Sequence, residues 1–140
     1  MPDHSLKVIS PADAFKLLKE NPKAVLLDVR STTEYLLVGH PIGSIHIPWI
    51  DEPDWIVDPH FVTNVRKILL GGIAENTDPS PVLLICRSGK RSRDAGNALL
   101  HAGFPEVYNI LEGFEGELDE QHHRGTNSGW RFHGLPWEQT

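Results

Sequence analysis

The chain has a single cysteine, Cys86, and few of the features that would tie a protein to a membrane or to nucleic acid. With one cysteine among 140 residues, no disulfide can form within the chain, which fits a reducing compartment. Acidic residues outnumber basic residues by 19 to 13, and the net charge of −6 makes nucleic acid an unexpected partner. No apolar run approaches the roughly 20 residues of a membrane-spanning helix.

The N-terminal segment also lacks the marks of an export signal. Residues 1–5 contain no basic region, and no apolar stretch follows them, whereas a secretory signal peptide has both. We therefore expect a cytoplasmic protein with no membrane segment. A chain of this length fits one domain over residues 1–140. Such a domain buries about 68% of its unfolded surface, which is enough for a core without disulfides or metals.

Short apolar runs alternate with helix-like stretches along the chain. The apolar runs predict strands at 24–29, 44–47, 81–85 and 107–111. Periodic stretches predict helices from Pro11, after Ser10, to Asn21-Pro22, and at 32–38, 58–70 (ended by Gly71-Gly72) and 92–102. This alternation predicts an α/β fold, with a mainly parallel central sheet and helices on both faces. Residues 112–130, rich in glycine and charge, are predicted to form an extended surface loop.

Cys86 stands between a predicted strand and a predicted helix. Ligands of parallel α/β sheets bind beyond the carboxyl ends of strands, and a helix N-terminus offers unpaired N–H groups and partial positive charge. Four cations follow the cysteine: Arg87, Lys90, Arg91 and Arg93. These surroundings favour a thiolate and bind anions. A lone cysteine can also be a small core residue, but its place at the polar end of the run predicts a reactive, only partly buried thiol.

Residue spacing separates this segment from two other anion-binding loops. A tyrosine-phosphatase loop has five residues between its cysteine and its arginine, whereas here Arg91 follows after four and Ser92 occupies the phosphatase position. A phosphate-binding Walker loop needs a glycine where Leu84 stands. Phosphatase or arsenate-reductase-like chemistry is therefore a remote alternative, and the shorter loop suits a single sulfur atom.

Four blocks of sequence, in order, resemble a rhodanese-like sulfurtransferase domain. The blocks are Leu27-Asp28-Val29-Arg30 with Glu34-Tyr35, Gly39-His40, Gly43-Ser44 and Ile47-Pro48; Cys86-Arg87-Ser88-Gly89-Lys90-Arg91-Ser92; Gly103-Phe104 with Val107-Tyr108 and Leu111-Glu112-Gly113-Phe114; and Trp130 with Gly134-Leu135-Pro136-Trp137. The chain departs from the family pattern at Pro41-Ile42-Gly43-Ser44. It is also longer than minimal members between Gly113 and Trp130, which leaves the rim of the site and its acceptor open.

The resemblance implies a three-layer rhodanese-like fold and persulfide chemistry. Cys86 would be the catalytic nucleophile, taking a sulfane sulfur from thiosulfate or a similar anionic donor and passing it to a thiol or to cyanide. The implied substrate-binding residues are Arg87, Ser88, Gly89, Lys90, Arg91 and Ser92. No metal or organic cofactor is implied. The alternative is a carrier or sensor module that holds the persulfide for a sulfur-accepting protein without turnover.

Three further residues are candidate supports of the site. Asp28 and Arg30 could contact the loop, or they could form a structural ion pair at a strand end. Glu34 could orient Arg91, or it could lie on a solvated helix face. The adjacent pair His122-His123 does not predict a metal site, because neighbouring side chains point apart and no cysteine is close.

Overall fold

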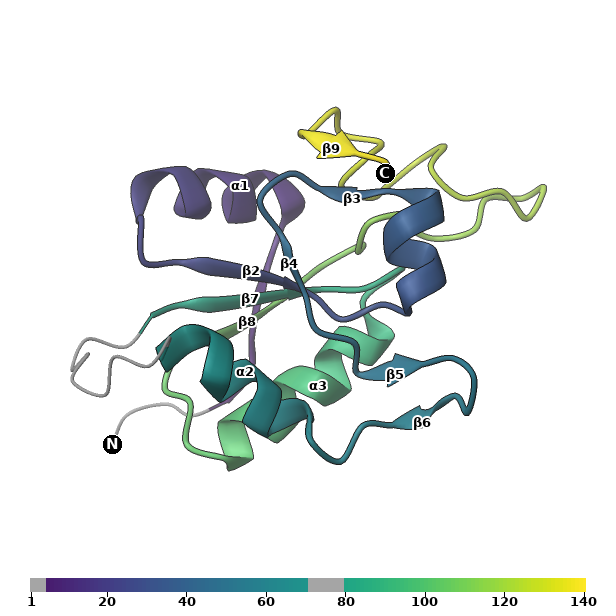
Figure 1. The fold of residues 1–140 in the computed structure, drawn as a ribbon. Helices are drawn as coiled ribbons and strands as arrows, with labels where there is room; N and C mark the ends of the chain where they lie inside the picture. The colour runs from purple at the N-terminus through teal and green to yellow at the C-terminus, as the bar shows by residue number, and fades with distance from the viewer. Residues whose placement is uncertain (1–4, 71–79) are drawn as a thin grey trace.

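A five-stranded parallel sheet forms the centre of the protein (Figure 1). The computed structural model describes residues 5–70 and 80–140. The strands lie in the order β1-β8-β7-β2-β4, and every neighbouring pair is parallel. Their bounds are β1 Lys7–Ile9, β2 Val25–Asp28, β4 Ile45–His46, β7 Val82–Ile85 and β8 Val107–Ile110.

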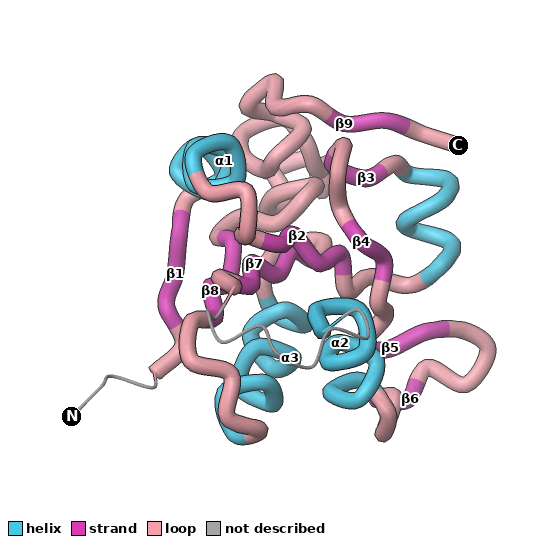
Figure 2. The backbone as a smooth tube through the Cα atoms, turned by 60° about the vertical axis from the view of Figure 1, so that its left-hand side comes forward, coloured by secondary structure: helices cyan, strands magenta, loops and turns pink. Residues whose placement is uncertain are grey.

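Helices cover both faces of this sheet (Figure 2). On one face lies α1 (Pro11–Glu20), which begins where the side chain of Ser10 accepts a hydrogen bond of 3.1 Å from the Asp13 amide. On the other face lie α2 (Phe61–Leu70) and α3 (Lys90–His101). The predicted three-layer α/β architecture is thus confirmed.

Alternating side chains of β7 divide the core between the two faces. Val82 and Leu84 join the cluster on the side of α2 and α3, whereas Leu83 and Ile85 join the cluster on the side of α1. All four side chains are fully buried, which explains the uninterrupted apolar run in the sequence. The alternation also decides which way the residue after the strand points.

Several short elements were not predicted from the sequence. The edge strand β1 is one of them, and two antiparallel ribbons are the others. The ribbons pair β3 (His40–Pro41) with β9 (Trp137–Glu138), and β5 (Ile50–Asp51) with β6 (Ile56–Val57). Strands of two or three residues are too short to show a period-two pattern.

The starts of α2 and α3 differ from the prediction. The helix expected from residue 92 begins at Lys90, after Gly89 in the left-handed region with φ 109°, and the helix expected from residue 58 begins at Phe61. The predicted stop at Gly71-Gly72 lies outside the described residues. No helix in the part of the chain that the structure describes is long and apolar enough to cross a membrane.

The short helix expected at 32–38 is a π-helix, η1 (Glu34–Val38). Ser31 and Glu34 cap its start reciprocally, because the Glu34 amide donates to Ser31 Oγ and the Ser31 amide donates to Glu34 Oε1, each at 3.3 Å. This is a capping box, and its signature was present in the sequence as Ser-Thr-Thr-Glu. The capping box fixes the backbone that carries Glu34.

Candidate active site

Cys86 follows β7 directly and is buried, with 1% of its surface exposed. The expectation of a partly buried thiol was wrong. The cause is the alternation of β7, which continues through residue 86 and turns the side chain into the core cluster shared by α2 and α3. The polar residues next to Cys86 in the sequence are therefore a poor guide to the environment of its sulfur.

Two hydrogen-bond donors converge on the Cys86 sulfur. The Gly89 amide lies 3.1 Å from Sγ, and the Ser92 hydroxyl lies 3.2 Å from it. Gly89 can turn its amide inward because its φ of 109° is a conformation that side chains rarely allow. Ser92 sits in the first turn of α3, where the amide dipoles favour negative charge. The site is therefore built to stabilise an anionic sulfur.

Asn109 on β8 connects both donors and was missed from the sequence. Its Nδ2 donates to the Gly89 carbonyl at 3.0 Å, and its Oδ1 accepts from Ser92 Oγ at 2.5 Å. Asn109 is 5% exposed. The available signal was a lone amide within an otherwise apolar strand, since a buried polar side chain needs partners.

The outer side of the loop is tied to the segment that follows β8. The Phe114 amide donates to the Cys86 carbonyl at 2.8 Å, and the Glu115 and Gly116 amides donate to the Arg87 carbonyl at 3.0 and 3.2 Å. With these carbonyls bound on the outside, the loop keeps the orientation in which Gly89 faces the sulfur. Phe114 and Trp130, at the ends of the stretch predicted as a surface loop, are buried.

Residues 113–116 lie against residues 128–131, which closes the base of the intervening loop. The Trp130 amide donates to the Gly113 carbonyl at 2.8 Å. Gly116 and Gly129 meet backbone to backbone, so that a Cβ on Gly129 would come within 2.7 Å of the Gly116 nitrogen. Neither position has room for a side chain. Residues 117–128 extend outward from this junction.

Gly113→Ala should displace the active-site loop. Gly113 has φ +65°, and an added Cβ would lie 2.5 Å from the backbone of Cys86 and Arg87, which cannot yield as a flexible side chain could. We expect a loss of more than about 3 kcal/mol in the free energy of unfolding, as for other strained and overpacked backbone sites. The sulfur chemistry of Cys86 that the sequence resemblance implies should fall with it. Urea unfolding measures the first effect and an activity assay the second.

Gly134→Ala is the matched control for this prediction. Gly134 has a similar φ of +74°, but nothing lies within 4 Å of an added Cβ. Gly134→Ala should lower the free energy of unfolding only through the strained backbone conformation, by about 1 kcal/mol. Equal losses in the two variants would contradict a steric role for Gly113.

Arg91 is held by Glu34 rather than lying free beside the loop. Its two terminal nitrogens lie 2.7 and 2.8 Å from the two carboxylate oxygens of Glu34. Burial acts to raise the pKa of Glu34, but the hydrogen bonds and charge of Arg91 outweigh it and the pKa of Glu34 is lowered. The hydrogen bond to Glu34 in turn raises the pKa of Arg91. The pair stays ionised and links η1 to α3.

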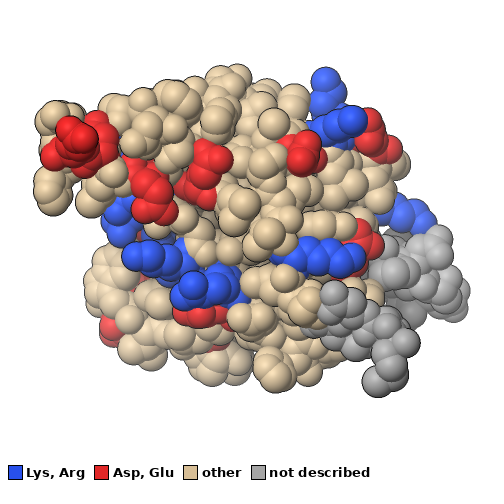
Figure 3. Space-filling view, turned by 180° about the vertical axis from the view of Figure 1, so that it is seen from behind, with Lys and Arg blue, Asp and Glu red and all other residues tan. Residues whose placement is uncertain are grey.

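Arg87, in the loop, and Lys90, at the start of α3, are both exposed. In the described residues, neither side chain forms an ion pair. An open pocket of about 470 Å³ lies beside the loop, and its lining residues are Ser31, Thr33, Glu34, Ile50, Glu52, Trp55, Arg87 and Arg91. Figure 3 shows basic side chains gathered across the middle of one face, with acidic side chains next to them. Two free cations therefore remain available for an anion.

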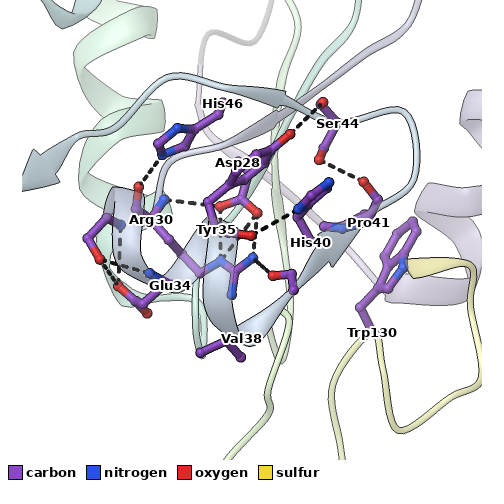
Figure 4. A network of polar contacts seen from close by, with 12 residues as sticks. Asp28, Arg30, Glu34, Tyr35, Val38, His40, Pro41, Ser44, His46 and Trp130 are labelled. Atoms are coloured by element: carbon purple, nitrogen blue, oxygen red, sulfur yellow. Dashed lines mark hydrogen bonds and ion pairs between the residues drawn. The ribbon is translucent and has the colours of Figure 1, made fainter. Parts of the chain in front are cut away.

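Asp28 and Arg30 form a buried ion pair (Figure 4). Arg30 Nη2 lies 2.7 Å from Asp28 Oδ2 and 2.5 Å from the Gly39 carbonyl, and the guanidinium stacks 4.4 Å from the ring centroid of Phe114. Both side chains are fully buried. The pair thus connects β2, the end of η1 and the segment that clamps the loop.

Tyr35 anchors η1 to the neighbouring strands (Figure 4). Its ring stacks between His40 and His46, with centroid distances of 3.9 and 4.4 Å. His46 Nε2 also lies 2.8 Å from the Arg30 carbonyl. These contacts hold the helix that presents Glu34. Among residues 5–70 and 80–140, no three His, Cys, Asp or Glu side chains group as a metal site would.

The fold and the site together define an α/β protein with a cysteine at the carboxyl edge of a parallel sheet, facing donors at the start of a helix. Residues 11–119 match the rhodanese-like domain family. The chain belongs to that family, as the sequence blocks predicted.

Individual relatives match over nearly the whole chain. The crystal structure of Rv0390 from M. tuberculosis is 37% identical, with a TM-score of 0.82, and the match covers 97% of this chain and 99% of that one. An uncharacterized protein of Rickettsia rickettsii is 30% identical over 96% of this chain and 98% of its own. The thiosulfate sulfurtransferase GlpE of Actinobacillus pleuropneumoniae serotype 3 is 28% identical over 93% of this chain and 91% of its own. Family and relatives support a sulfurtransferase-family role.

Proposed function

We propose that this protein transfers a sulfane sulfur from thiosulfate, or a similar anionic donor, to a thiophilic acceptor through a persulfide on Cys86. The Cys86 thiolate attacks the outer sulfur of thiosulfate, a new sulfur–sulfur bond forms, and the old one breaks as sulfite leaves with its electron pair. An acceptor thiolate or cyanide then attacks the outer sulfur, and Cys86 leaves as thiolate. The bonds that form and break in these two steps require no cofactor.

The observation that carries this proposal is the pair of donors on the Cys86 sulfur. The Gly89 amide and the Ser92 hydroxyl lie 3.1 and 3.2 Å from Sγ, where they can stabilise a thiolate. Such preorganised donors stabilise developing negative charge without reorganisation. The likeness to a thiosulfate sulfurtransferase points to the same chemistry.

A carrier or sensor module that holds the persulfide without turnover is the second candidate. The burial of Cys86, at 1% exposed, favours it, since burial slows the approach of an acceptor to the sulfur. Both candidates need Cys86 and both predict loading by a sulfur donor. Turnover with thiosulfate and cyanide separates them, because only an enzyme releases thiocyanate repeatedly.

Intact mass after thiosulfate treatment tests the shared step. We expect a gain of one sulfur atom, reversed by a thiol, and carried by the peptide that contains Cys86. A protein that keeps its original mass at saturating thiosulfate would overturn the proposal. Steady release of thiocyanate would favour the enzyme, and loading without release would favour the carrier.

Arg87→Ala should weaken thiosulfate binding more than it slows the chemistry. Arg87 is exposed, lines the pocket and is not committed to a carboxylate as Arg91 is. We expect KM to rise about fivefold with kcat nearly unchanged, which is the effect of losing roughly 1 kcal/mol of uniform binding. The control is Arg93→Ala, an exposed arginine of α3 that lies 3.8 Å from Asp94. Equal effects of the two changes would contradict a local role for Arg87.

A further inference from the structure

Three buried side chains share too few protons for all of their contacts once Cys86 is a thiolate. Ser92 Oγ lies 3.2 Å from Cys86 Sγ and 2.5 Å from Asn109 Oδ1. Cys86, Ser92 and Asn109 are 1%, 0% and 5% exposed. A hydroxyl has one proton, so Ser92 can donate to the sulfur or to the amide oxygen, but not to both.

The orientation of the Asn109 amide is fixed by its other contact. One end of the amide lies 3.0 Å from the Gly89 carbonyl, which can only accept, so this end must be the donor Nδ2. The opposite end, Oδ1, can only accept and therefore needs the proton of Ser92. Since the site is buried, water does not relieve the competition, and a lost partner is costly.

We propose that Asn109 is a positioning residue that controls the Ser92 proton according to the state of the sulfur. While Cys86 is a thiol, its S–H donates to Ser92 Oγ and the Ser92 hydroxyl donates to Asn109 Oδ1. When the thiol loses its proton to water, the Ser92 hydroxyl turns to the sulfur and Asn109 Oδ1 loses its donor. No covalent bond to Ser92 or Asn109 changes.

Asn109 thus acts on the sulfur in two opposed ways. By binding the Gly89 carbonyl, it holds the amide that lies 3.1 Å from Sγ. By accepting from Ser92, it opposes ionisation of the thiol. The variants below leave the charged groups near the site unchanged. Arg91 interacts with the charge of Cys86 and with that of Asp28. The others are Glu34, paired with Arg91, Arg30, paired with Asp28, and the exposed Arg87 and Lys90.

Asn109→Leu tests the competition, because it keeps a branched side chain and removes the acceptor. With Cys86 as the lone cysteine, ultraviolet absorbance of the thiolate can be followed against pH, with a Cys86→Ser protein as the blank. We expect the midpoint to fall by about one pH unit, which corresponds to a tenfold change in the ionisation equilibrium. In a Ser92→Ala background the same Asn109→Leu change should have little effect. The control is Asn97→Leu on the exposed side of α3, which should not move the midpoint.

A measurement on the unaltered protein covers the case in which Asn109→Leu does not fold. The NMR signal of the Asn109 side-chain amide should shift with the same midpoint as the thiolate absorbance, and that of Asn97 should not. In Ser92→Ala, the shift of Asn109 should shrink. An Asn109 signal that stays constant through the titration, or an Asn109→Leu effect that persists fully without Ser92, would overturn the inference.

The biological role of this proton control rests on the proposed function, since the sulfur concerned is the one that would carry the persulfide. Its tests, however, measure the ionisation of Cys86 and the response of the Asn109 amide, and they need no sulfur donor. If thiosulfate adds no mass while the titrations come out as expected, the proposed function fails and the Asn109 assignment stands. If thiosulfate loads Cys86 and the titrations fail, the reverse holds.

Discussion

Cys86→Ser should abolish sulfur transfer and leave the fold intact. The serine oxygen cannot form a persulfide, and the chain has no other cysteine to replace the nucleophile. We expect activity with thiosulfate and cyanide to fall by more than about 10³-fold, as in other enzymes that lose their nucleophile. The hydroxyl can keep the Gly89 amide and Ser92 as partners, so the free energy of unfolding should change by less than about 2 kcal/mol.

Mass spectrometry and circular dichroism check the two halves of this prediction. The substituted protein should gain no sulfur from thiosulfate, while its spectrum and its unfolding transition remain cooperative. Asn97→Ser, an exposed change on α3, should behave as the unaltered protein in both assays. Transfer near the original rate in Cys86→Ser would show that the reaction does not pass through this sulfur.

Asp28→Ala should produce the largest loss of stability among the charged residues of the site. It leaves the fully buried Arg30 without its carboxylate, and Arg30 Nη1 has no hydrogen-bond partner even in the intact protein. Breaking a buried pair in this way costs about 3–5 kcal/mol, a large part of the roughly 5–15 kcal/mol that stabilises a domain. Urea unfolding gives the free energy directly.

Two further variants show whether the orphaned charge is the cause. Asp94→Ala removes a carboxylate whose side chain is 62% exposed and lies 3.8 Å from Arg93, and it should cost less than about 1 kcal/mol. The double change Asp28→Leu with Arg30→Met removes both charges and should recover most of the stability, as in other replaced buried pairs. If the double variant is as unstable as Asp28→Ala, the penalty comes from packing and not from the charge.

The sequence was sufficient for the sheet and for the place of Cys86 between a strand and a helix. Runs such as 81–85 are long enough and apolar enough to be read as buried strands, and the alternation of strands and helices leaves few α/β arrangements. One of the two-residue ribbons is formed by a contact between distant segments, that of His40 with Glu138. No local pattern encodes such pairs.

The surroundings of Cys86 were harder to predict for a related reason. The residues that follow Cys86 in the sequence are polar, but the direction in which β7 ends turns its side chain into the core. Asn109, which holds the groups that contact the sulfur, lies 23 positions further along the chain. Glu34 reaches Arg91 from a different element, and the sequence left its role open between that contact and a solvated helix face. Local propensity does not report contacts of this kind.

The junction of Gly116 with Gly129 brings the two ends of one long loop together beside the segment that holds the Cys86 loop. Because the two backbones meet there, residues 117–128 start and finish at one place. Within them, Arg124 and Gly125 also donate back to the carbonyls of Gly116 and Glu115, at 2.7 and 2.8 Å. Doubling such a loop adds only about 0.6 kcal/mol of closure entropy. Changes of length within residues 117–123 should therefore cost little, whereas a change that displaces Arg124 or Gly125 would reach the segment that binds the Cys86 and Arg87 carbonyls.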